Sequence, residues 1–289
     1  MSAMAYITPG LTKIDFEDNL FVTTELDRDT NKEVKEYIES KGGIIKSSVT
    51  KGTNYLIYKD GEEETTKYKK ALELVQEKGL EITILPLSLF ATLCKGEGVV
   101  EFGSYPFEAD GAKQPIIWAV LKRDGNKALL LSAYGLDCKP YNENLKKVTW
   151  ETCTLRKWLN EDFYHAAFTD EEKRQILLTK IENADNPEYQ APGGNDTEDK
   201  IFLLSIDEVK EYLAEAYERK TAPTPYAVKQ GADIYNGNCW WCLRSPGLYA
   251  NRAADVNRVG LIESDGGDVD IDFAAVCPAL WVNLESEIK

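Results

Sequence analysis

The stretch "WWCLRSPGLYANRAADVNRVGLIESDGGDVDIDFAAVCPALWVNL", residues 240–284, places bulky apolar residues on both sides of a long polar segment. Trp240 and Trp241 begin the stretch, and Leu280 and Trp281 stand near its end. Burial of aromatic side chains removes large apolar areas from water, at about 25 cal/mol per Å². We therefore expect these four residues to be buried and to form a rigid frame around the segment between them.

Arg244 stands in the first half of this frame, between an apolar run and Ser245-Pro246. A guanidinium group stays charged in proteins, so a buried arginine needs a carboxylate partner. We expect Arg244 to be a buried framework residue paired with a carboxylate rather than part of a binding surface.

The segment between the two halves of the frame interleaves small or apolar residues with a mixed set. Residues typical of a scaffold are Ala250, Ala253, Ala254, Val256, Val259, Gly260, Ile262, Gly266, Val269, Ala274, Ala275 and Val276. We expect the mixed residues to lie together on one exposed, ligand-binding surface. The predicted ligand-binding residues are Leu248, Tyr249, Asn251, Arg252, Asp255, Arg258, Leu261, Glu263, Ser264, Asp265, Asp268, Asp270, Ile271, Asp272 and Phe273.

Four aspartates of this segment, Asp265, Asp268, Asp270 and Asp272, stand within eight residues. Calcium is the metal that suits such a run, but it takes six to eight oxygen ligands around one point. The spacing of two instead predicts Asp268, Asp270 and Asp272 in a row along one strand face. We expect no bound metal and no other cofactor.

The chain has 289 residues, 43% of them hydrophobic, and a net charge of −15. This length suits two domains, which we place at residues 1–95 and 99–289, with a junction within residues 94–106. An acidic surface repels phosphate backbones, so we expect no nucleic-acid partner. The first residues show no signal-peptide pattern, and no apolar run approaches the ~18 residues of a membrane helix. We therefore expect a cytoplasmic protein without a membrane segment.

Six cysteines occur, and without an export signal we expect free thiols. Cys239 and Cys242 have the C-x-x-C spacing of redox and zinc sites. Zinc would need a second ligand pair, which the sequence lacks, and the neighbouring residues do not predict the strand-to-helix turn of a thioredoxin-type site. We favour a structural role. With a single histidine, His165, and no glycine-rich phosphate loop, we do not expect an enzyme.

Residues 21–93 alternate short apolar runs with amphipathic segments. One helix is predicted within residues 29–43, ending at Gly42-Gly43, and a second within residues 65–79. The order β-α-β-β-α-β-α predicts a small, mostly parallel sheet with helices on both faces. The helix residues expected to face inward are Val34, Tyr37, Ile38, Tyr68, Ala71, Leu72 and Val75.

This part of the chain resembles a BRCT domain over about 75 residues, a length typical of a small domain. The resemblance rests on the Gly42-Gly43 pair, on "VTKGTNYLI" (residues 49–57) and on "TTKYKKALE" (residues 65–73) at the start of the second helix. It implies a small α/β domain that mediates protein contacts.

Phosphopeptide-binding BRCT domains hold phosphate with a Ser or Thr after the first strand, a backbone amide and a Lys of the second helix. The resemblance places Thr23 or Thr24 and Lys67 at those positions. The glycine that usually follows the Ser or Thr is absent, and Leu89 or Phe90 replaces the usual tryptophan of the last helix. In the alternative interpretation, Lys67 is an ordinary solvated lysine and the domain makes only protein contacts.

The second part of the chain has an α+β pattern with an irregular antiparallel sheet. Residues 115–141 predict a hairpin that turns at Asp124-Gly125. Two helices are expected within residues 149–177, the second capped by Thr169, and residues 182–200 read as a polar loop. A further helix would begin at Ser205, with Glu208 completing a capping box.

Together, "WWCLRSPG" (residues 240–247), "VCPALWVNL" (residues 276–284) and the runs before them resemble a bacterial family with the C-type lectin fold. It is the branch related to formylglycine-generating enzymes, which includes the variable proteins of diversity-generating retroelements. The resemblance covers residues 99–284. Two departures are Cys242, inserted into the tryptophan motif, and Cys277, which replaces an arginine.

The resemblance implies a ligand-binding protein with a variable region at about residues 248–273 and a macromolecular partner, most simply a protein. Retroelement mutagenesis converts asparagine codons of the form AAY, which can reach fifteen residue types but not Lys, Glu, Gln, Trp or Met. With Gly267 added, the mixed set holds sixteen residues, and fifteen of them are reachable, Glu263 being the exception. This composition favours a diversified surface.

We expect the partner to be held by a broad, shallow patch rather than a pocket. Tyr249, Arg252, Arg258 and Phe273 are residue types that dominate the affinity of protein interfaces. The aspartates, Asp255 included, would favour a basic partner surface.

Two alternatives follow from the same resemblance. A formylglycine-generating-enzyme-like oxidase would use a reactive cysteine pair, for which Cys242 and Cys277 are the nearest candidates. A calcium-dependent carbohydrate-binding lectin would use the aspartates, although the Glu-Pro-Asn and Trp-Asn-Asp signatures of such lectins are absent from the sequence.

Overall fold

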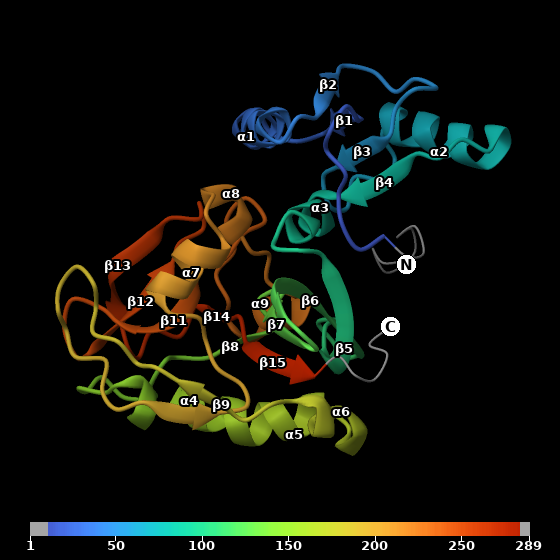
Figure 1. Ribbon diagram of the computed structural model, residues 1–289. Coiled ribbons are helices and arrows are strands. Elements are labelled where there is room, and N and C mark those ends of the chain that lie inside the picture. Colours follow the sequence, from blue (N-terminus) through green and yellow to red (C-terminus); the bar gives the residue numbers. More distant parts are fainter. Residues whose placement is uncertain (1–10, 284–289) are drawn as a thin grey trace. The chain divides into compact units, whose positions relative to one another are not determined.

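The computed structural model describes residues 11–283. The chain divides into two compact units, with the boundary between Cys94 and Lys95 (Figure 1). Each unit has its own sheets and its own buried core. The architecture is mixed, with an α/β unit followed by an α+β unit.

The first unit contains a four-stranded sheet in the order β2-β1-β3-β4, with every strand pair parallel. The predicted order β-α-β-β-α-β-α is confirmed. The elements are β1 (Leu20–Thr24), α1 (Arg28–Ser40), β2 (Ile44–Lys46), β3 (Tyr55–Tyr58), α2 (Thr66–Lys78), β4 (Thr83–Pro86) and α3 (Leu87–Leu93).

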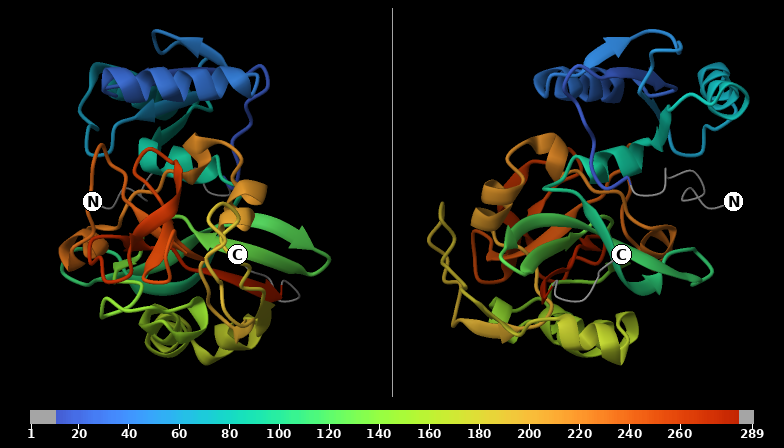
Figure 2. Two further views of the ribbon diagram at one scale, coloured as in Figure 1. Left: turned by 90° about the vertical axis from the view of Figure 1, so that its left-hand side faces the viewer. Right: turned by 45° about the vertical axis from the view of Figure 1, so that its right-hand side comes forward.

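Alternation along the central strands supplies apolar side chains to both faces of this sheet. Val22 packs with Tyr68 of α2, whereas Phe21 stacks on Phe16, which also contacts Tyr37 of α1 and Phe90 of α3. Figures 1 and 2 show α1 and α2 on opposite sides of the strands. Helices therefore cover both faces, as predicted.

The inward face of α2 differs in detail from the prediction. Tyr68 and Ala71 are buried as expected, but Leu74 is the third fully buried residue, and Leu72 and Val75 are only partly buried. The three buried positions follow the i, i+3, i+6 spacing of a narrow stripe, which leaves the predicted neighbours at its margin.

The Gly42-Gly43 pair is required by the turn that follows α1. Gly42 has φ of +88°, a conformation that strains residues with a Cβ. A Cβ on Gly43 would lie 2.5 Å from Ile38 Cγ2 and 2.9 Å from the Phe21 ring. Close packing of the turn on the core thus explains both glycines.

The second unit contains a five-stranded sheet in the order β13-β12-β11-β14-β8, a four-stranded sheet in the order β15-β7-β6-β5 and the pair β10-β9. The strands are β5 (Val99–Pro106), β6 (Lys113–Asp124), β7 (Lys127–Ser132), β8 (Asp137–Cys138), β9 (Thr179–Ile181), β10 (Thr197–Asp199), β11 (Trp241–Pro246), β12 (Arg252–Val256), β13 (Ile262–Asp268), β14 (Ala275–Val276) and β15 (Ala279–Asn283). The predicted hairpin, turning at Asp124-Gly125, is β6–β7.

Pairing in this unit is antiparallel except between β11 and β14, which run parallel. The expectation of an antiparallel sheet is therefore wrong at this one pair. Trp241 pairs with Ala275, because the chain after β13 crosses to the other side of β11 before it forms β14.

The helices of the second unit are short. They are α4 (Thr154–Trp158), α5 (Tyr164–Ala167), α6 (Asp170–Gln175), α7 (Ile206–Tyr212), α8 (Ala216–Arg219) and α9 (Pro225–Gln230). A π-helical stretch, Leu159–Phe163, joins α4 to α5 without a break, so two helices occupy this region as predicted, and Thr169 caps the second. Figure 1 shows α4, α5 and α6 in a row beside β9 and β15. No helix within residues 11–283 is long and apolar enough to cross a membrane.

Only two of the four residues that were expected to frame the segment are fully buried. Trp241 and Leu280 are fully buried as predicted, but Trp240 and Trp281 are partly exposed and pack against the margin of the core. Alternation along β15 explains Trp281, since Leu280 and Val282 face the core and the residue between them faces the other way. Trp240 precedes β11 and borders a cavity.

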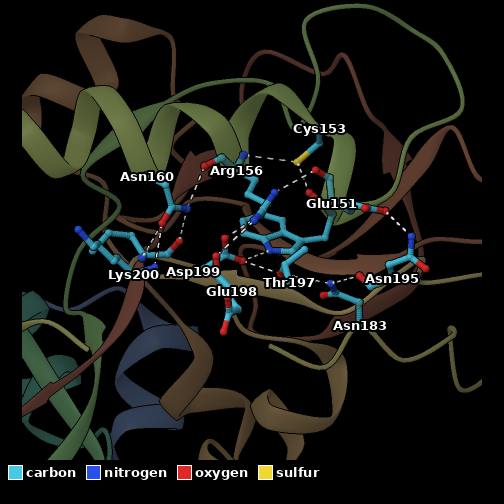
Figure 3. A network of polar contacts seen from close by, with 12 residues as sticks. Glu151, Cys153, Arg156, Asn160, Asn183, Asn195, Thr197, Glu198, Asp199 and Lys200 are labelled. Atoms are coloured by element: carbon cyan, nitrogen blue, oxygen red, sulfur yellow. Dashed lines mark hydrogen bonds and ion pairs between the residues drawn. The ribbon is translucent and has the colours of Figure 1, made fainter. Parts of the chain in front are cut away.

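Residues 182–200 are not the simple polar loop that their composition predicts. Asp199, at the end of β10, is buried, and its carboxylate accepts hydrogen bonds from Arg156 Nε (2.7 Å), Thr197 Oγ1 (2.7 Å) and Trp150 Nε1 (2.9 Å). Figure 3 shows this network, which joins β10 to α4. The loop residues Asn183 and Asn186 are also buried. Polar composition here reflects buried hydrogen bonds rather than exposure.

Arg244 is a buried framework residue, as predicted, and its carboxylate partner is Glu208 of α7. The guanidinium also donates to the carbonyl oxygens of Leu203 (2.8 Å) and Glu182 (3.2 Å). Glu208 in turn accepts from the backbone N–H of Ser205 in the predicted capping box. One ion pair therefore connects β11, α7 and the loop that begins at residue 182.

Removing this carboxylate leaves a charged guanidinium buried. We predict that Glu208→Ala lowers the free energy of unfolding by about 3 kcal/mol, because Arg244 loses its partner and the capping box of α7 loses the bond from the Ser205 backbone N–H to Glu208. Urea denaturation measures the effect. The matched control is Glu211→Ala on the same helix, whose exposed side chain lies 3.9 Å from Lys122 and should change stability by about 0.5 kcal/mol at most. Equal effects of the two variants would refute the framework role.

Candidate functional site

The β12–β13 hairpin and the loops that flank it contain all of the predicted ligand-binding residues. The side chain of Asn257 shapes the turn between the strands, accepting from the backbone N–H groups of Val259 and Leu261 (3.0 Å each). Gly260 completes the turn with φ of +84°, where a Cβ would lie 1.9 Å from the carbonyl oxygen of Ala216. The hairpin is thus held against the segment at α8.

Fourteen of the fifteen predicted ligand-binding residues are partly or fully exposed. Tyr249 is 60% exposed and Leu261 is 53% exposed, in the loops at the two ends of β12. Asp255 is the exception, at 8% exposed. The prediction that Val259 belongs to the scaffold is wrong, since this residue is half exposed at the tip of the turn.

A cavity of about 290 Å³ opens among these residues. Six predicted ligand-binding residues line it: Asp255, Glu263, Asp265, Asp268, Ile271 and Phe273. Tyr141, Trp240, Cys242, Ala253 and Ala274 supply mostly apolar or aromatic surface to the same cavity. The predicted surface therefore includes a cavity beside the bulged β12–β13 pairing and the loop after β13.

Asp255 is buried because its strand alternates between core and cavity. Ala254 and Val256 point into the core, whereas Ala253 and Asp255 line the cavity. Burial raises the pKa of the Asp255 carboxyl to about 7; the nearby negative charge of Glu263 adds to the increase, and the backbone N–H of Gly267 opposes it. Its Oδ1 atom has no hydrogen-bond partner.

The other carboxylates of the cavity are only partly neutralised by the protein. Asp268 lies 3.4 Å from Arg252 Nε, and Glu263 accepts a hydrogen bond from the Asn257 amide. The predicted surface residue Arg258 turns elsewhere, to Asp233 (2.8 Å), and its guanidinium lies 5.2 Å from the centre of the Tyr235 ring and 5.7 Å from that of Trp240. The site has an excess of negative charge.

The expected row of aspartates along one strand face does not form. Strand β13 ends at Asp268, so Asp270 and Asp272 lie in the turn and bend that follow it. The carbonyl oxygen of Asp272 accepts from the Cys138 thiol at 3.0 Å, which fixes this bend. Within residues 11–283, no group of three His, Cys, Asp or Glu side chains is arranged to hold a metal ion.

Asn186 connects two strands of the site, a role that the sequence did not predict. Its amide nitrogen donates to the carbonyl oxygens of Pro246 (2.7 Å) and Ser264 (2.8 Å), and its Oδ1 accepts from the backbone N–H groups of Glu188 and Tyr189 (2.9 Å each). One buried amide thus ties the end of β11 to β13. Only the high proportion of Asn and Asp in residues 182–200 signalled such a role.

The six cysteines are buried thiols, including the C-x-x-C pair. Burial raises the pKa of the Cys277 thiol to about 12 and also raises that of Cys242. Neutral thiols are poor nucleophiles and metal ligands.

A second hollow, of about 350 Å³, lies in the first unit at the predicted phosphate position. Its lining includes Thr23, Thr24, Lys35, Lys46 and Lys67, with Glu25 as the acidic member. The Lys67 ammonium donates to the Thr23 carbonyl oxygen (2.9 Å), and the Thr23 hydroxyl donates to Asn31 Oδ1 (2.7 Å). The three predicted residues do lie together, although both threonines are largely buried.

Comparison with known families assigns most of the chain. The family model described as "Domain of unknown function (DUF6273)" matches residues 125–284. The model of the BRCA1 C Terminus (BRCT) domain matches residues 13–75, which confirms the BRCT resemblance. A DNA ligase of Acanthamoeba polyphaga mimivirus is 46% identical over 44 residues, a match that covers 15% of this chain and 7% of the ligase. No solved structure matches the chain.

The raised pKa of Asp255 predicts a specific pH dependence of stability. A carboxyl with a higher pKa in the folded than in the unfolded protein makes the unfolding free energy fall as pH rises between the two values, here from about 4 to about 7. Asp255→Asn removes this loss. Its stability relative to the wild-type protein should therefore grow by about 2 kcal/mol between pH 5 and pH 8 in urea denaturation.

Asp270→Asn is the matched control for this measurement, because Asp270 is exposed and outside the cavity. The gain in stability between pH 5 and pH 8 that is expected of Asp255→Asn comes from burial in the cavity, so this variant should not reproduce it. Parallel pH profiles for the wild-type protein and Asp255→Asn would show that Asp255 ionises normally in the folded state.

Proposed function

The chain belongs to the DUF6273 family, and we propose that its second unit is a non-enzymatic ligand-binding module with a C-type lectin fold. In this proposal, residues 248–273 form the binding surface, and its partner is a macromolecule, most simply a protein. The first unit, a BRCT domain, serves as a second site for protein contacts.

One observation supports this proposal above the others. Side chains of the hairpin divide between two environments: Ala254, Val256 and Val269 are buried, while fourteen of the fifteen predicted ligand-binding residues are at least partly exposed. A residue that contributes little to the core can change with little loss of stability, within about 0.5 kcal/mol at an exposed position. Such a division suits a surface whose side chains vary while the framework stays fixed.

The likeness to the variable proteins of diversity-generating retroelements suggests why this surface would tolerate many side chains. The motifs "WWCLRSPG" and "VCPALWVNL" flank the hairpin, and fifteen of the sixteen mixed residues are of types that mutated AAY codons can encode. We propose that this surface is one member of a diversified set.

The two alternative functions have weaker support. An oxidase would need reactive thiols, but burial raises the pKa values of both Cys242 and Cys277. A calcium-dependent lectin would need aspartates gathered around one point, but Asp268, Asp270 and Asp272 spread from a strand end into a turn and a bend.

The charge and the cysteines of the chain add two further elements to the proposal. A net charge of −15 disfavours nucleic acid as the partner of the binding surface. Six buried thiols suit a reducing compartment, so we propose a cytoplasmic location.

The BRCT domain offers a second candidate function, which is anion binding. Lys35, Lys46 and Lys67 converge on a hollow that contains one carboxylate, from Glu25. Ammonium groups and threonine hydroxyls are the donors that a phosphate requires. We propose that this hollow binds a phosphorylated side chain of a protein partner.

Tolerance of the binding surface can be tested with two display libraries. In the first, NNY codons replace the codons of Leu248, Tyr249, Leu261, Ser264, Asp270, Asp272 and Phe273, which are all exposed or partly exposed. We predict that most members remain folded, as judged by protease resistance, and that selection against an unrelated protein target yields binders. The physical reason is that these side chains contribute little to the core.

The matched library applies the same codons to seven buried framework positions: Leu243, Ala254, Val256, Val269, Ala275, Val276 and Leu280. Few of its members should fold, because polar or oversized residues enter the core. Equal protease sensitivity of the two libraries, or a folded first library without binders to any target, would contradict the proposed function.

Anion binding by the BRCT domain can be tested by thermal denaturation with inorganic phosphate. Phosphate should raise the Tm of the first unit's transition in the full chain, since a ligand that binds only the folded state stabilises it. The double variant Lys46→Ala with Lys67→Ala should remove this shift. Lys70→Ala, which removes an exposed lysine paired with Glu73 on the same helix, should preserve it. An unchanged shift in the double variant would exclude this hollow as the site.

A further inference from the structure

We propose that the cavity beside β12 and β13 binds a guanidinium group, such as an arginine side chain presented by a partner, with Asp255 as its buried counter-ion. This inference rests on the proposed function, because the cavity belongs to the proposed binding surface. It adds the chemical class of the group that the surface recognises.

Charge is the first reason for this assignment. Four carboxylates line the cavity, from Asp255, Glu263, Asp265 and Asp268, and no lysine or arginine stands among the described residues of its lining. Arg252, next to the cavity, lies 3.4 Å from Asp268 and neutralises one of the four charges in part. Such a site repels anions and attracts cations.

Asp255 gives the second and independent reason. Its side chain is more than nine-tenths buried, lines the cavity, and leaves Oδ1 without a hydrogen-bond donor. Buried polar atoms in proteins nearly always have a partner, so an unpartnered acceptor at a cavity wall marks the place for a donor from a ligand. The nearby protein donors are already engaged, since Asn257 donates to Glu263 and Arg252 faces Asp268.

The walls of the cavity distinguish an organic cation from a metal ion. Tyr141, Trp240 and Phe273 present aromatic surface, and Ile271 and Ala274 present aliphatic surface. A calcium ion needs six to eight oxygen ligands around one point, and no three carboxylates within residues 11–283 are arranged to hold a metal ion. A guanidinium group instead combines charge with flat faces that stack on aromatic rings.

The protein already contains an intramolecular example of this recognition. The Arg258 guanidinium lies 5.7 Å from the centre of the Trp240 ring and pairs with the Asp233 carboxylate at 2.8 Å. The cavity repeats this combination with the same indole and the Asp255 carboxylate. Planar guanidinium, rather than a compact ammonium, fits a pair of neighbouring carboxylates bidentately.

Size limits the ligand to a small group. The cavity volume of about 290 Å³ is at the lower end of the range of ligand pockets, about 300–1,000 Å³. Such a space suits one side-chain head group rather than a sugar chain. Exposed residues of the proposed surface outside the cavity lining, such as Tyr249 and Leu261, are then available to contact the rest of a partner.

The test is a titration of the full chain with n-butylguanidinium at pH 8, above the pKa of about 7 that burial gives Asp255. Binding is followed by tryptophan fluorescence and by NMR shifts of the β12 and β13 amides. We expect a Kd on the order of millimolar for this small fragment, and at least tenfold weaker binding of n-butylammonium.

Asp255→Asn should weaken n-butylguanidinium binding at least tenfold, and Glu263→Gln should weaken it to a lesser degree. Glu211→Gln makes the same change of net charge outside the cavity and outside the proposed binding surface, and should alter the Kd less than twofold. The amide spectrum of each variant establishes that it is folded. Glu263→Gln keeps the inference testable if Asp255→Asn is not folded.

Absence of binding by the wild-type protein, or equal affinities of Asp255→Asn and Glu211→Gln, would overturn the inference. Equal binding of n-butylammonium would overturn the guanidinium assignment, as would calcium that competes with the probe at micromolar concentration. The probe requires no macromolecular partner, so its failure is distinct from failure of the proposed function. Display libraries that yield binders while n-butylguanidinium does not bind would refute only the cavity inference.

Discussion

The buried guanidinium of Arg244 is the constraint on which the second unit depends. It sits in β11, the central strand of the five-stranded sheet, and contacts the Glu208 carboxylate of α7 together with the Leu203 and Glu182 carbonyl oxygens. A buried charge needs every one of these partners, so it admits one arrangement of the strand, the helix and the loop. The carbonyl oxygen of Arg244 also accepts from the Tyr141 hydroxyl, which extends the constraint to the edge of the cavity.

Because these contacts hold β11 in place, the proposed binding surface on the β12–β13 hairpin can vary its side chains with little loss of stability. Asn186 anchors the ends of β11 and β13 through their backbone carbonyl oxygens, and backbone groups remain the same whatever side chain follows. Ala254 and Val256 of β12 pack in the core, whereas Ala253 and Asp255 of the same strand line the cavity. Buried polar contacts therefore stabilise the framework, and strand alternation places the side chains of the proposed binding surface. Stability and binding then depend on different residues.

The cavity contains an arrangement that is unfavourable for the stability of the free protein. Asp255 is kept buried beside Glu263, which raises its pKa, and one of its oxygens lacks a donor. An arrangement that lowers the stability of the free protein is typical of sites whose interactions are completed by a ligand. The second hollow, in the BRCT domain, has the opposite charge, with three lysines against one glutamate. The two proposed sites thus suit ligands of opposite charge.

Local sequence patterns determined the order of elements in the first unit, the β6–β7 hairpin and the capping box at Ser205, because each depends on residues a few positions apart. The apolar and polar alternation of residues 248–273 likewise predicted most of the exposed surface. Only the tertiary structure decided that Asp255 is buried, that Trp240 borders a cavity, that the aspartate run leaves its strand at Asp268, and that Asn186 and Asp199 are interior residues. These features depend on a bulged strand register and on hydrogen bonds between segments about 40 to 80 positions apart, and no local pattern records which distant partner a polar side chain will meet.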